Sequence, residues 1–240
     1  MADEKKPLIE HLEELRRRLL FCIVSVAALS ALSYSFSKEI LRHFSKYVNR
    51  LIFITPAEAF LSYLKISLFC GLILSAPVIL FNALRFVWVA LKKREKGLFV
   101  LFFASGIFLF VSGCAFSYFA AIPIAINFLL SYSSDFLRPY ISVSQYISFT
   151  AFILLGSGVI FELPLFVILL ARVGLIKYHA LQAKRRYFIV AAFVIAAFLT
   201  PPDIITQIIL ALPLIALYEI SILAVKILER RGKHDTRRAD

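Results

Sequence analysis

The stretch GSGVIFELPLF at residues 156–166 contains Glu162, the one charged residue between Arg138 and Arg172. Most residues around this acid are apolar, and the uncharged segment exceeds the roughly 20 helical residues that cross a hydrocarbon core of about 30 Å. The stretch therefore predicts a membrane-spanning helix that carries one acid at membrane depth.

The composition of the 240-residue chain supports this prediction, because 61% of its residues are hydrophobic and 15% are aromatic. Soluble globular domains contain about 45–50% apolar residues. The apolar residues here lie in continuous runs, whereas a β-barrel would show short segments of alternating polarity. We therefore expect an all-α membrane protein that forms a single polytopic domain over residues 1–240.

Six apolar segments are predicted to be transmembrane helices. We place them at about residues 19–36, 55–86, 98–122, 142–171, 187–199 and 204–225. The third is expected to end at Pro123, and the fifth reaches only about 20 Å at the helical rise, so the bilayer must thin there or neighbours must shield it. Because Pro164 should kink the fourth helix, we expect a concave bundle of kinked helices in which helices five and six are short.

The positive charges orient these six helices. Twenty of the 27 Lys and Arg residues lie before the first helix, at residues 92–96, between the fourth and fifth helices, or after the sixth. The positive-inside rule then places both termini in the cytoplasm. Residues 8–20 are expected to form an amphipathic helix on the membrane surface that turns into helix one, and residues 226–240 a cytoplasmic tail. Topology and contact with anionic lipids, and not nucleic-acid binding, explain the net charge of +12.

Several classes of function are excluded by missing patterns. The sequence contains no G-x-x-x-x-G-K-[ST] phosphate loop and no G-x-S-x-G elbow, and its four histidines are scattered. Cys22, Cys70 and Cys114 lie far apart inside apolar runs, which indicates neither a disulfide framework nor a metal cluster. We therefore expect no enzyme activity, no metal and no cofactor.

Glu162 is a functional candidate, because a carboxylate at the centre of a bilayer costs about 2.5–3.5 kcal/mol on insertion scales. Pro164 lacks a backbone donor and its ring clashes with the carbonyl of Ile160, which predicts a kink beside the acid. One alternative is a neutral buried acid bonded to a backbone carbonyl that the proline frees. Another is the proton or ion site of a secondary transporter, but such proteins have two related repeats, and none is visible here.

The opposite ends of the helices carry capping patterns. In Thr55-Pro56-Ala57-Glu58 the threonine occupies an N-cap, the proline the first helical position and the glutamate the third. This is a capping box, so Pro56 and Glu58 have a structural explanation. Asp203 either caps helix six itself or is the third residue after a Thr200 cap, and both cases predict a tight hairpin between helices five and six.

Five stretches, taken in order, carry a resemblance to a known family. They are HLEELRRRLL at 11–20, PAEAFLSYLK at 56–65, LSAPVILF at 74–81, FELP at 161–164 and LTPPDIITQ at 199–207. From Leu8 to about Lys226 the chain resembles the TatC family, the multispanning integral membrane subunit of the twin-arginine (Sec-independent) protein translocase. The chain departs from the family after Phe86, where it reads VWVALKK and the family commonly has a proline.

The resemblance implies a receptor for the twin-arginine signal peptides of folded precursor proteins. It implies assembly with small single-span TatA/TatB-type subunits, in export driven by the proton-motive force. It further implies a multi-pass protein of the prokaryotic cytoplasmic (inner) membrane that works as a homo-oligomer within a larger complex.

The resemblance also implies a site for the arginine pair. Glu14 and Glu95 fall where the family binds it, with Phe86 nearby. A guanidinium presents a planar fork that a carboxylate accepts through two hydrogen bonds, and lysine cannot reproduce this geometry. Arg16 and Arg17 are expected to position the acids and to contact lipid headgroups. From the residues alone, Glu95 is also compatible with one solvated charge among others.

A second implied site lies within the membrane. Glu162 and Gln207 fall on the concave face that the family uses to engage partner helices and the deeper part of the signal peptide. Pro164 bends the helix at that face. The resemblance therefore favours another helix, and not an ion, as the ligand of Glu162.

Overall fold

The structure, a computed structural model, describes residues 5–48, 51–88, 97–134, 136, 139–200 and 204–236. The described residues are mostly helical. The chain divides into two compact units, Met1–Phe103 with Tyr140–Ala151 and Ala104–Pro139 with Phe152–Asp240. Two helices, α4 (Phe99–Phe116) and α6 (Val143–Phe161), contribute residues to both units.

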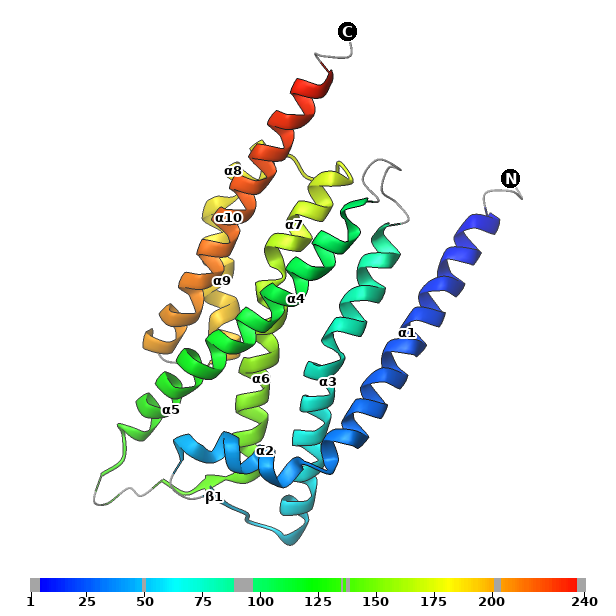
Figure 1. Ribbon diagram of the computed structural model, residues 1–240. Coiled ribbons are helices and arrows are strands. Elements are labelled where there is room, and N and C mark those ends of the chain that lie inside the picture. The colour runs from blue at the N-terminus through cyan, green and yellow to red at the C-terminus, as the bar shows by residue number, and fades with distance from the viewer. Residues whose placement is uncertain are drawn as a thin grey trace. The chain divides into compact units, whose positions relative to one another are not determined.

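The first unit is built around two long helices. In chain order it contains α1 (Lys5–Tyr34), α2 (Ser37–Phe44), η1 (Ser45–Tyr47), β1 (Leu51–Ile52), α3 (Pro56–Trp88), the start of α4, β2 (Ile141–Ser142) and the start of α6 (Figure 1). The two short strands pair in parallel, with Leu51 opposite Ile141 and Ile52 opposite Ser142. This pairing joins the segment before α3 to the segment before α6.

Helix α1 is continuous from Lys5 to Tyr34. The expected turn between an amphipathic helix at residues 8–20 and helix one is therefore wrong. The segment contains no glycine, and its one proline, Pro7, lies in the first turn, where a missing N–H breaks no helical bond. An ion pair between Glu14 and Arg18, four residues apart, supports the helix where the turn was expected.

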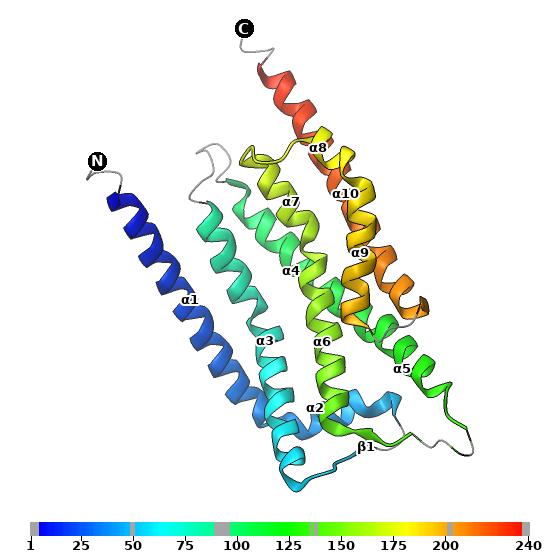
Figure 2. The same cartoon turned by 180° about the vertical axis from the view of Figure 1, so that it is seen from behind.

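Helices α1 and α3 lie side by side (Figures 1 and 2). A Cβ atom added at Gly71 of α3 would lie 2.0 Å from the Oγ of Ser30 and 2.6 Å from its backbone nitrogen. Only glycine fits at this contact, because real side chains do not approach backbone atoms so closely. Small residues allow such close helix packing in membranes, where lipid is as apolar as the helices themselves.

Helix α2 is a short amphipathic helix that departs sharply from α1. The chain turns by 81° between Leu12–Tyr34 and Ser37–Tyr47. On one side of α2, Ile40, Leu41 and Phe44 pack against a buried cluster of α3 and α6 residues, and the hydroxyl of Tyr146 donates a hydrogen bond to the Phe44 carbonyl. These contacts hold α2 across the ends of the other helices in this unit.

The second unit holds the remaining helices. It contains the rest of α4, η3 (Ser117–Ala121), α5 (Ile122–Leu130), most of α6, α7 (Leu163–Arg172), α8 (Tyr178–Ala183), α9 (Arg185–Leu199) and α10 (Ile204–Thr236) (Figure 2). The ring of Tyr218 on α10 stacks on Phe188 of α9 with a centroid distance of 3.9 Å. The Tyr218 hydroxyl donates to the carbonyl of Leu181 at 2.9 Å, so one side chain joins α8, α9 and α10.

The expected end of the third span at Pro123 is wrong. From α4 the helix continues through the π-helical turn η3 into α5 and reaches Leu130. A π turn bonds each N–H to the carbonyl five residues back and so shifts the hydrogen-bond register. Here it directly precedes α5, where Pro123 lies in the first turn and its missing N–H interrupts no helical bond.

The last two helices differ in length. Helix α9 has 15 residues, as expected for a short fifth helix, whereas α10 has 33 and continues through residues 226–236 of the predicted tail. The far part of α10 is held by α8, because Oε1 of Glu229 accepts a hydrogen bond from the Tyr178 N–H at 2.7 Å. The ammonium of Lys226 lies 5.5 Å from the centroid of the same tyrosine ring. These contacts explain why the helix extends beyond its apolar part.

Four helices of the described chain are long and apolar enough to cross a membrane. They are Pro56–Phe86, Phe99–Leu130, Val143–Arg172 and Ile204–Arg230. The bent pair of Leu12–Tyr34 and Ser37–Tyr47 makes a fifth if it counts as one span. The all-α membrane fold is confirmed, while the count of six spans and the cytoplasmic termini stay predictions.

We expect Gly71→Ala to lower the stability of the detergent-solubilised protein by about 1–3 kcal/mol, the range typical of overpacking. The added methyl group would overlap the backbone of Ser30, which cannot rotate away. The measurement is the temperature at which the folded protein is lost in size-exclusion chromatography. Gly97→Ala is the control, because nothing lies within 4 Å of a Cβ added there. Equal stability of the two variants would contradict the tight contact between α1 and α3.

Candidate functional site

A groove of about 850 Å³ is formed by α1, α3 and the start of α4. Its charged part is lined by Glu14, Arg17, Arg18 and Arg85. Its apolar part is lined by side chains that include Leu20, Phe21, Val24, Val78 and Phe81. Such a groove suits a ligand that is charged at one end and apolar along its length.

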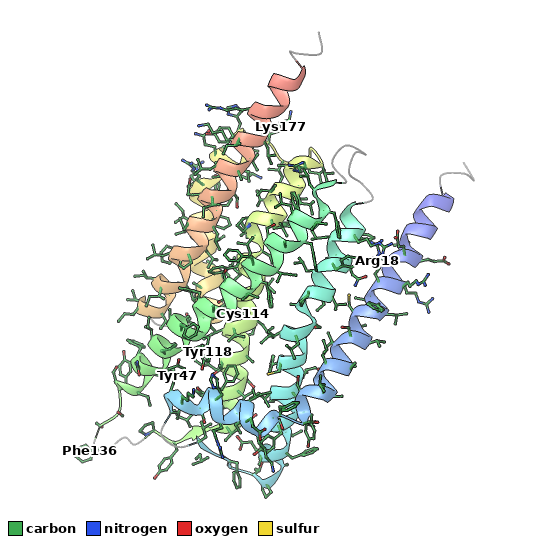
Figure 3. The ribbon with its side chains drawn as sticks, viewed as in Figure 1. Arg18, Tyr47, Cys114, Tyr118, Phe136 and Lys177 are labelled. Carbon is green, nitrogen blue, oxygen red and sulfur yellow. The ribbon has the colours of Figure 1, made fainter. Side chains whose placement is uncertain are left out.

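Glu14 lies at the charged part of this groove. Its carboxylate accepts a hydrogen bond from Nη2 of Arg18. The side chain of Glu14 is 40% exposed and that of Arg18 is 13% exposed, so the acid remains accessible to a ligand. The guanidinium carbon of Arg18 lies 5.9 Å from the centroid of the Phe86 ring, and Figure 3 shows Arg18 on the side of α1 that faces α3. Glu14, Arg18 and Phe86 therefore form one cluster.

The structure brings together part of the predicted site for an arginine pair. Glu14 and Arg17 line the groove, and Phe86 contacts the cluster through Arg18. Arg16 is exposed and does not line the groove. Glu95 lies outside the described residues.

Two residues of the groove, Arg18 and Arg85, were not predicted as site residues. The four-residue spacing from Glu14 to Arg18 predicts a helical ion pair, which the structure confirms, but it assigns no role to Arg18. Nothing in the sequence relates Arg85 on α3 to Glu14 on α1, because their proximity depends on how the two helices pack.

The fourth predicted span is interrupted at Glu162, between α6 and α7. The N–H of Glu162 donates to the Val159 carbonyl at 3.1 Å, three residues back instead of four. Regular bonding resumes where the N–H of Phe166 donates to the Glu162 carbonyl at 3.0 Å. Pro164 lies in the first turn of α7, where a missing donor interrupts no helical bond. The helical bonding is therefore interrupted beside the acid, while the kink expected from Pro164 stays a prediction.

Both carboxylate oxygens of Glu162 are buried, and neither has a hydrogen-bond partner within the part of the chain that the structure describes. The alternative of an acid bonded to a freed backbone carbonyl is therefore not supported. A buried polar group without a partner costs about 1–3 kcal/mol. Such groups are rare in native structures, which makes Glu162 a candidate functional residue.

Gln207 lies in the first turn of α10. Its Nε2 donates a hydrogen bond to the Phe193 carbonyl of α9 at 2.9 Å and so ties the two helices together. It also lines a groove of about 390 Å³ whose other side chains are apolar residues of α9, and which Glu162 does not line. An apolar wall with one amide suits a membrane helix that carries one polar side chain. Asp203, expected to cap this helix, lies outside the described residues.

Glu58 holds the start of α3 to the start of α6. Its Oε2 accepts a hydrogen bond from the Ile54 N–H at 2.6 Å. Its Oε1 accepts hydrogen bonds from the Ser142 hydroxyl and from the Ser144 N–H, the latter at 3.3 Å. Pro56 is the first residue of α3, as the capping pattern predicts. The carboxylate of Glu58 thus bonds to donors at the starts of two helices.

The described cysteines and histidines form no metal-binding cluster. Cys22, Cys70 and Cys114 are free thiols. No group of three or more His, Cys, Asp or Glu residues that could hold a metal ion occurs within residues 5–236 as far as these are described. The described residues therefore offer no candidate metal centre.

The chain matches the family described as Sec-independent protein translocase protein (TatC) over residues 10–213. The protein of that name from Aquifex aeolicus is 38% identical, over 95% of this chain and 98% of the relative. The one from Escherichia coli K12 is 34% identical, over 97% of this chain and 93% of the relative. A crystal structure described as the twin arginine translocase receptor TatC matches with a TM-score of 0.80 and 38% identity, over 90% of this chain and 98% of that one.

We expect Glu162→Leu to raise the stability of the purified protein, because leucine has a similar size and removes a buried carboxyl group that has no described partner. A gain of about 1–3 kcal/mol corresponds to a rise in the unfolding midpoint of about 2–12 °C for a chain of this size. Thermal unfolding in detergent measures it. Glu13→Leu, at an exposed acid of α1, is the control and should leave the midpoint unchanged. A lower midpoint for Glu162→Leu would show that the carboxyl group stabilises the isolated chain.

Proposed function

We propose that this chain, which belongs to the TatC family of Sec-independent protein translocase proteins, is the receptor subunit of a twin-arginine translocase. It binds the twin-arginine signal peptides of folded precursor proteins at the charged part of the groove formed by α1 and α3. It then assembles with small single-span TatA/TatB-type subunits for export driven by the proton-motive force.

The observation that carries this proposal is the exposed carboxylate of Glu14 in a cluster with the Phe86 ring. A carboxylate accepts two parallel hydrogen bonds from a guanidinium, and an aromatic ring stacks on its planar face. The ammonium of lysine cannot form this fork. A site made of an acid and a ring therefore selects arginine over lysine by geometry and not by charge alone.

The surroundings of Glu14 support selectivity. Arg17 and Arg85 line the same groove and repel a cation that forms no specific bonds. Glu95 is proposed as the second acid of the site. Arg16 and Arg17 are proposed to position the acids and to contact lipid headgroups, since both side chains are exposed.

The apolar part of the groove supports the binding of a whole signal peptide. Signal peptides carry an apolar segment after their charged segment. Phe21, Val24 and Phe81 line the groove beyond the charged cluster and offer an apolar surface to that segment. One groove thus matches both parts of the peptide.

Two features of the second unit support a binding surface for partner helices. The groove beside Gln207 is apolar except for one amide, which matches a single-span helix with one polar residue. The buried carboxyl group of Glu162, next to Pro164, has no described partner and offers a hydrogen-bonding group at membrane depth. We assign both to contacts with the single-span subunits and the deeper part of the signal peptide.

The remaining parts of the proposal concern location and assembly. We place the protein in the prokaryotic cytoplasmic (inner) membrane, with both termini in the cytoplasm, because of its distribution of Lys and Arg. It acts without enzymatic chemistry and as a homo-oligomer within a larger complex. A secondary transporter that uses Glu162 is not favoured, because the relatives are named as protein translocase proteins.

The first prediction compares two peptides. A synthetic signal peptide with paired arginines should bind the purified protein about tenfold more tightly than the same peptide with paired lysines, because lysine loses the forked bonds to the acids. Glu14→Gln should remove most of this difference. The measurement is a fluorescence titration of labelled peptide into protein in nanodiscs.

The control for this experiment is Glu13→Gln, which removes the same charge from an exposed neighbour of Glu14. It should retain the preference for arginine. Equal binding of both peptides by the unmodified protein would contradict the receptor function. An unchanged preference in Glu14→Gln would remove Glu14 from the site.

The second prediction concerns partner helices. Gln207→Leu should reduce site-specific cross-linking of a single-span subunit to α9 and α10 severalfold, because the amide is the one polar side chain among the described residues that line that groove. Binding of the twin-arginine peptide to the isolated protein should not change. Asn127→Leu, at an exposed amide of α5, is the control. Unchanged cross-linking in Gln207→Leu would show that partner helices do not use this groove.

A further inference from the structure

We propose that Arg18 is a built-in competitor for the twin-arginine site. In the ligand-free protein its guanidinium occupies a place on Glu14 and beside Phe86 that one arginine of the signal peptide takes, and the peptide has to displace it. The inference rests on the proposed function, since it concerns the same acid and ring.

The contacts of Arg18 reproduce those that an arginine ligand would make. Its Nη2 donates to Oε1 of Glu14, and its guanidinium carbon lies 5.9 Å from the centre of the Phe86 ring. This distance is within the about 6 Å over which a cation interacts with an aromatic face. The resident group and the ligand therefore have the same chemistry and compete for the same two partners.

The guanidinium of Arg18 is only partly satisfied in its present position. Its Nη1 is buried without a hydrogen-bond partner among the described residues, so the resident guanidinium leaves one of its donor groups unsatisfied. An ion pair between residues four apart on a helix is weak when one partner is as exposed as Glu14. A ligand that satisfies more donors at the acid can therefore replace it.

Competition between Arg18 and the ligand explains why the site would select a peptide with two arginines. A peptide with one arginine exchanges one guanidinium on Glu14 for another, and the exchange brings little net gain. A peptide with two arginines gains a second set of charge-assisted bonds beyond those it replaces. The groove of about 850 Å³ leaves room for the displaced side chain. Arg18 thereby raises the binding free energy that a ligand must supply to occupy the site.

A role of Arg18 as a positioning residue predicts the opposite change in peptide affinity. If Arg18 positioned the Glu14 carboxylate for the ligand, its removal would weaken binding. The sign of the change in affinity therefore separates a competitor from a positioning residue.

The experiment uses Arg18→Gln in the full chain, in nanodiscs of neutral phosphatidylcholine, with labelled peptides that carry either two arginines or one arginine and one lysine. We expect the twin-arginine peptide to bind about three to ten times more tightly than to the unmodified protein, given the strength of one exposed ion pair and one cation–π contact. The ratio between the affinities of the two-arginine peptide and the one-arginine peptide should decrease. Arg18→Lys, which keeps the charge but loses the fork, should show a smaller gain.

Arg85→Gln is the matched control, because it removes the same charge from the same groove at a residue to which no positioning role is assigned. It reports how much any lost positive charge helps a cationic peptide to bind. A lower affinity in Arg18→Gln, or a gain no larger than that of Arg85→Gln, overturns the proposal. If the unmodified protein does not prefer paired arginines over paired lysines, the proposed function fails instead, so the two failures are distinguishable.

Discussion

Inside a bilayer a backbone N–H or C=O group has no water to bond, so a helix must satisfy these groups itself across the hydrocarbon. Two of the described spans shift or interrupt their helical bonding just before a proline. The π turn Ser117–Ala121 precedes Pro123, and the interruption at Glu162 precedes Pro164. In each case the missing donor falls in the first turn of the next helix, where it breaks no bond. The span continues past each proline, and the second interruption lies at a carboxyl group within an apolar span.

The same need for hydrogen-bond partners divides the polar side chains into two groups, those with a described partner and those without one. Glu58 accepts hydrogen bonds from three donors, and Gln207 donates to the carbonyl of Phe193, so each has a structural role in addition to any contact with a ligand. The oxygens of Glu162 have no partner within the described residues although they are buried. A group that costs stability in the isolated chain is best explained by a partner that arrives from outside, which is the role proposed for Glu162 toward another helix.

The charged groove of the first unit presents a different problem, because its acid is surrounded by basic residues. A lone carboxylate would attract many cations. Arg17, Arg18 and Arg85 in the same groove reduce this attraction, and Arg18 in addition contacts Glu14 and lies beside Phe86. This is the basis of the proposed preference for a ligand that brings two guanidiniums over one that brings a single charge. The proposed selectivity depends on what the ligand must replace as well as on what it contacts.

Features that depend on residues close together in the chain can be predicted from the sequence alone. The apolar runs predicted the membrane helices, Pro164 predicted the disturbance beside Glu162, and the spacing of Glu14 and Arg18 predicted their pair. Three other features become visible only in the folded chain: Arg85 shares a groove with Glu14, Glu58 bonds to Ser142, and α10 extends along α8 past its apolar part. Helical periodicity relates residues three or four apart and thereby fixes local pairs, whereas contacts between distant segments depend on which helix faces pack together, and no short pattern encodes that choice.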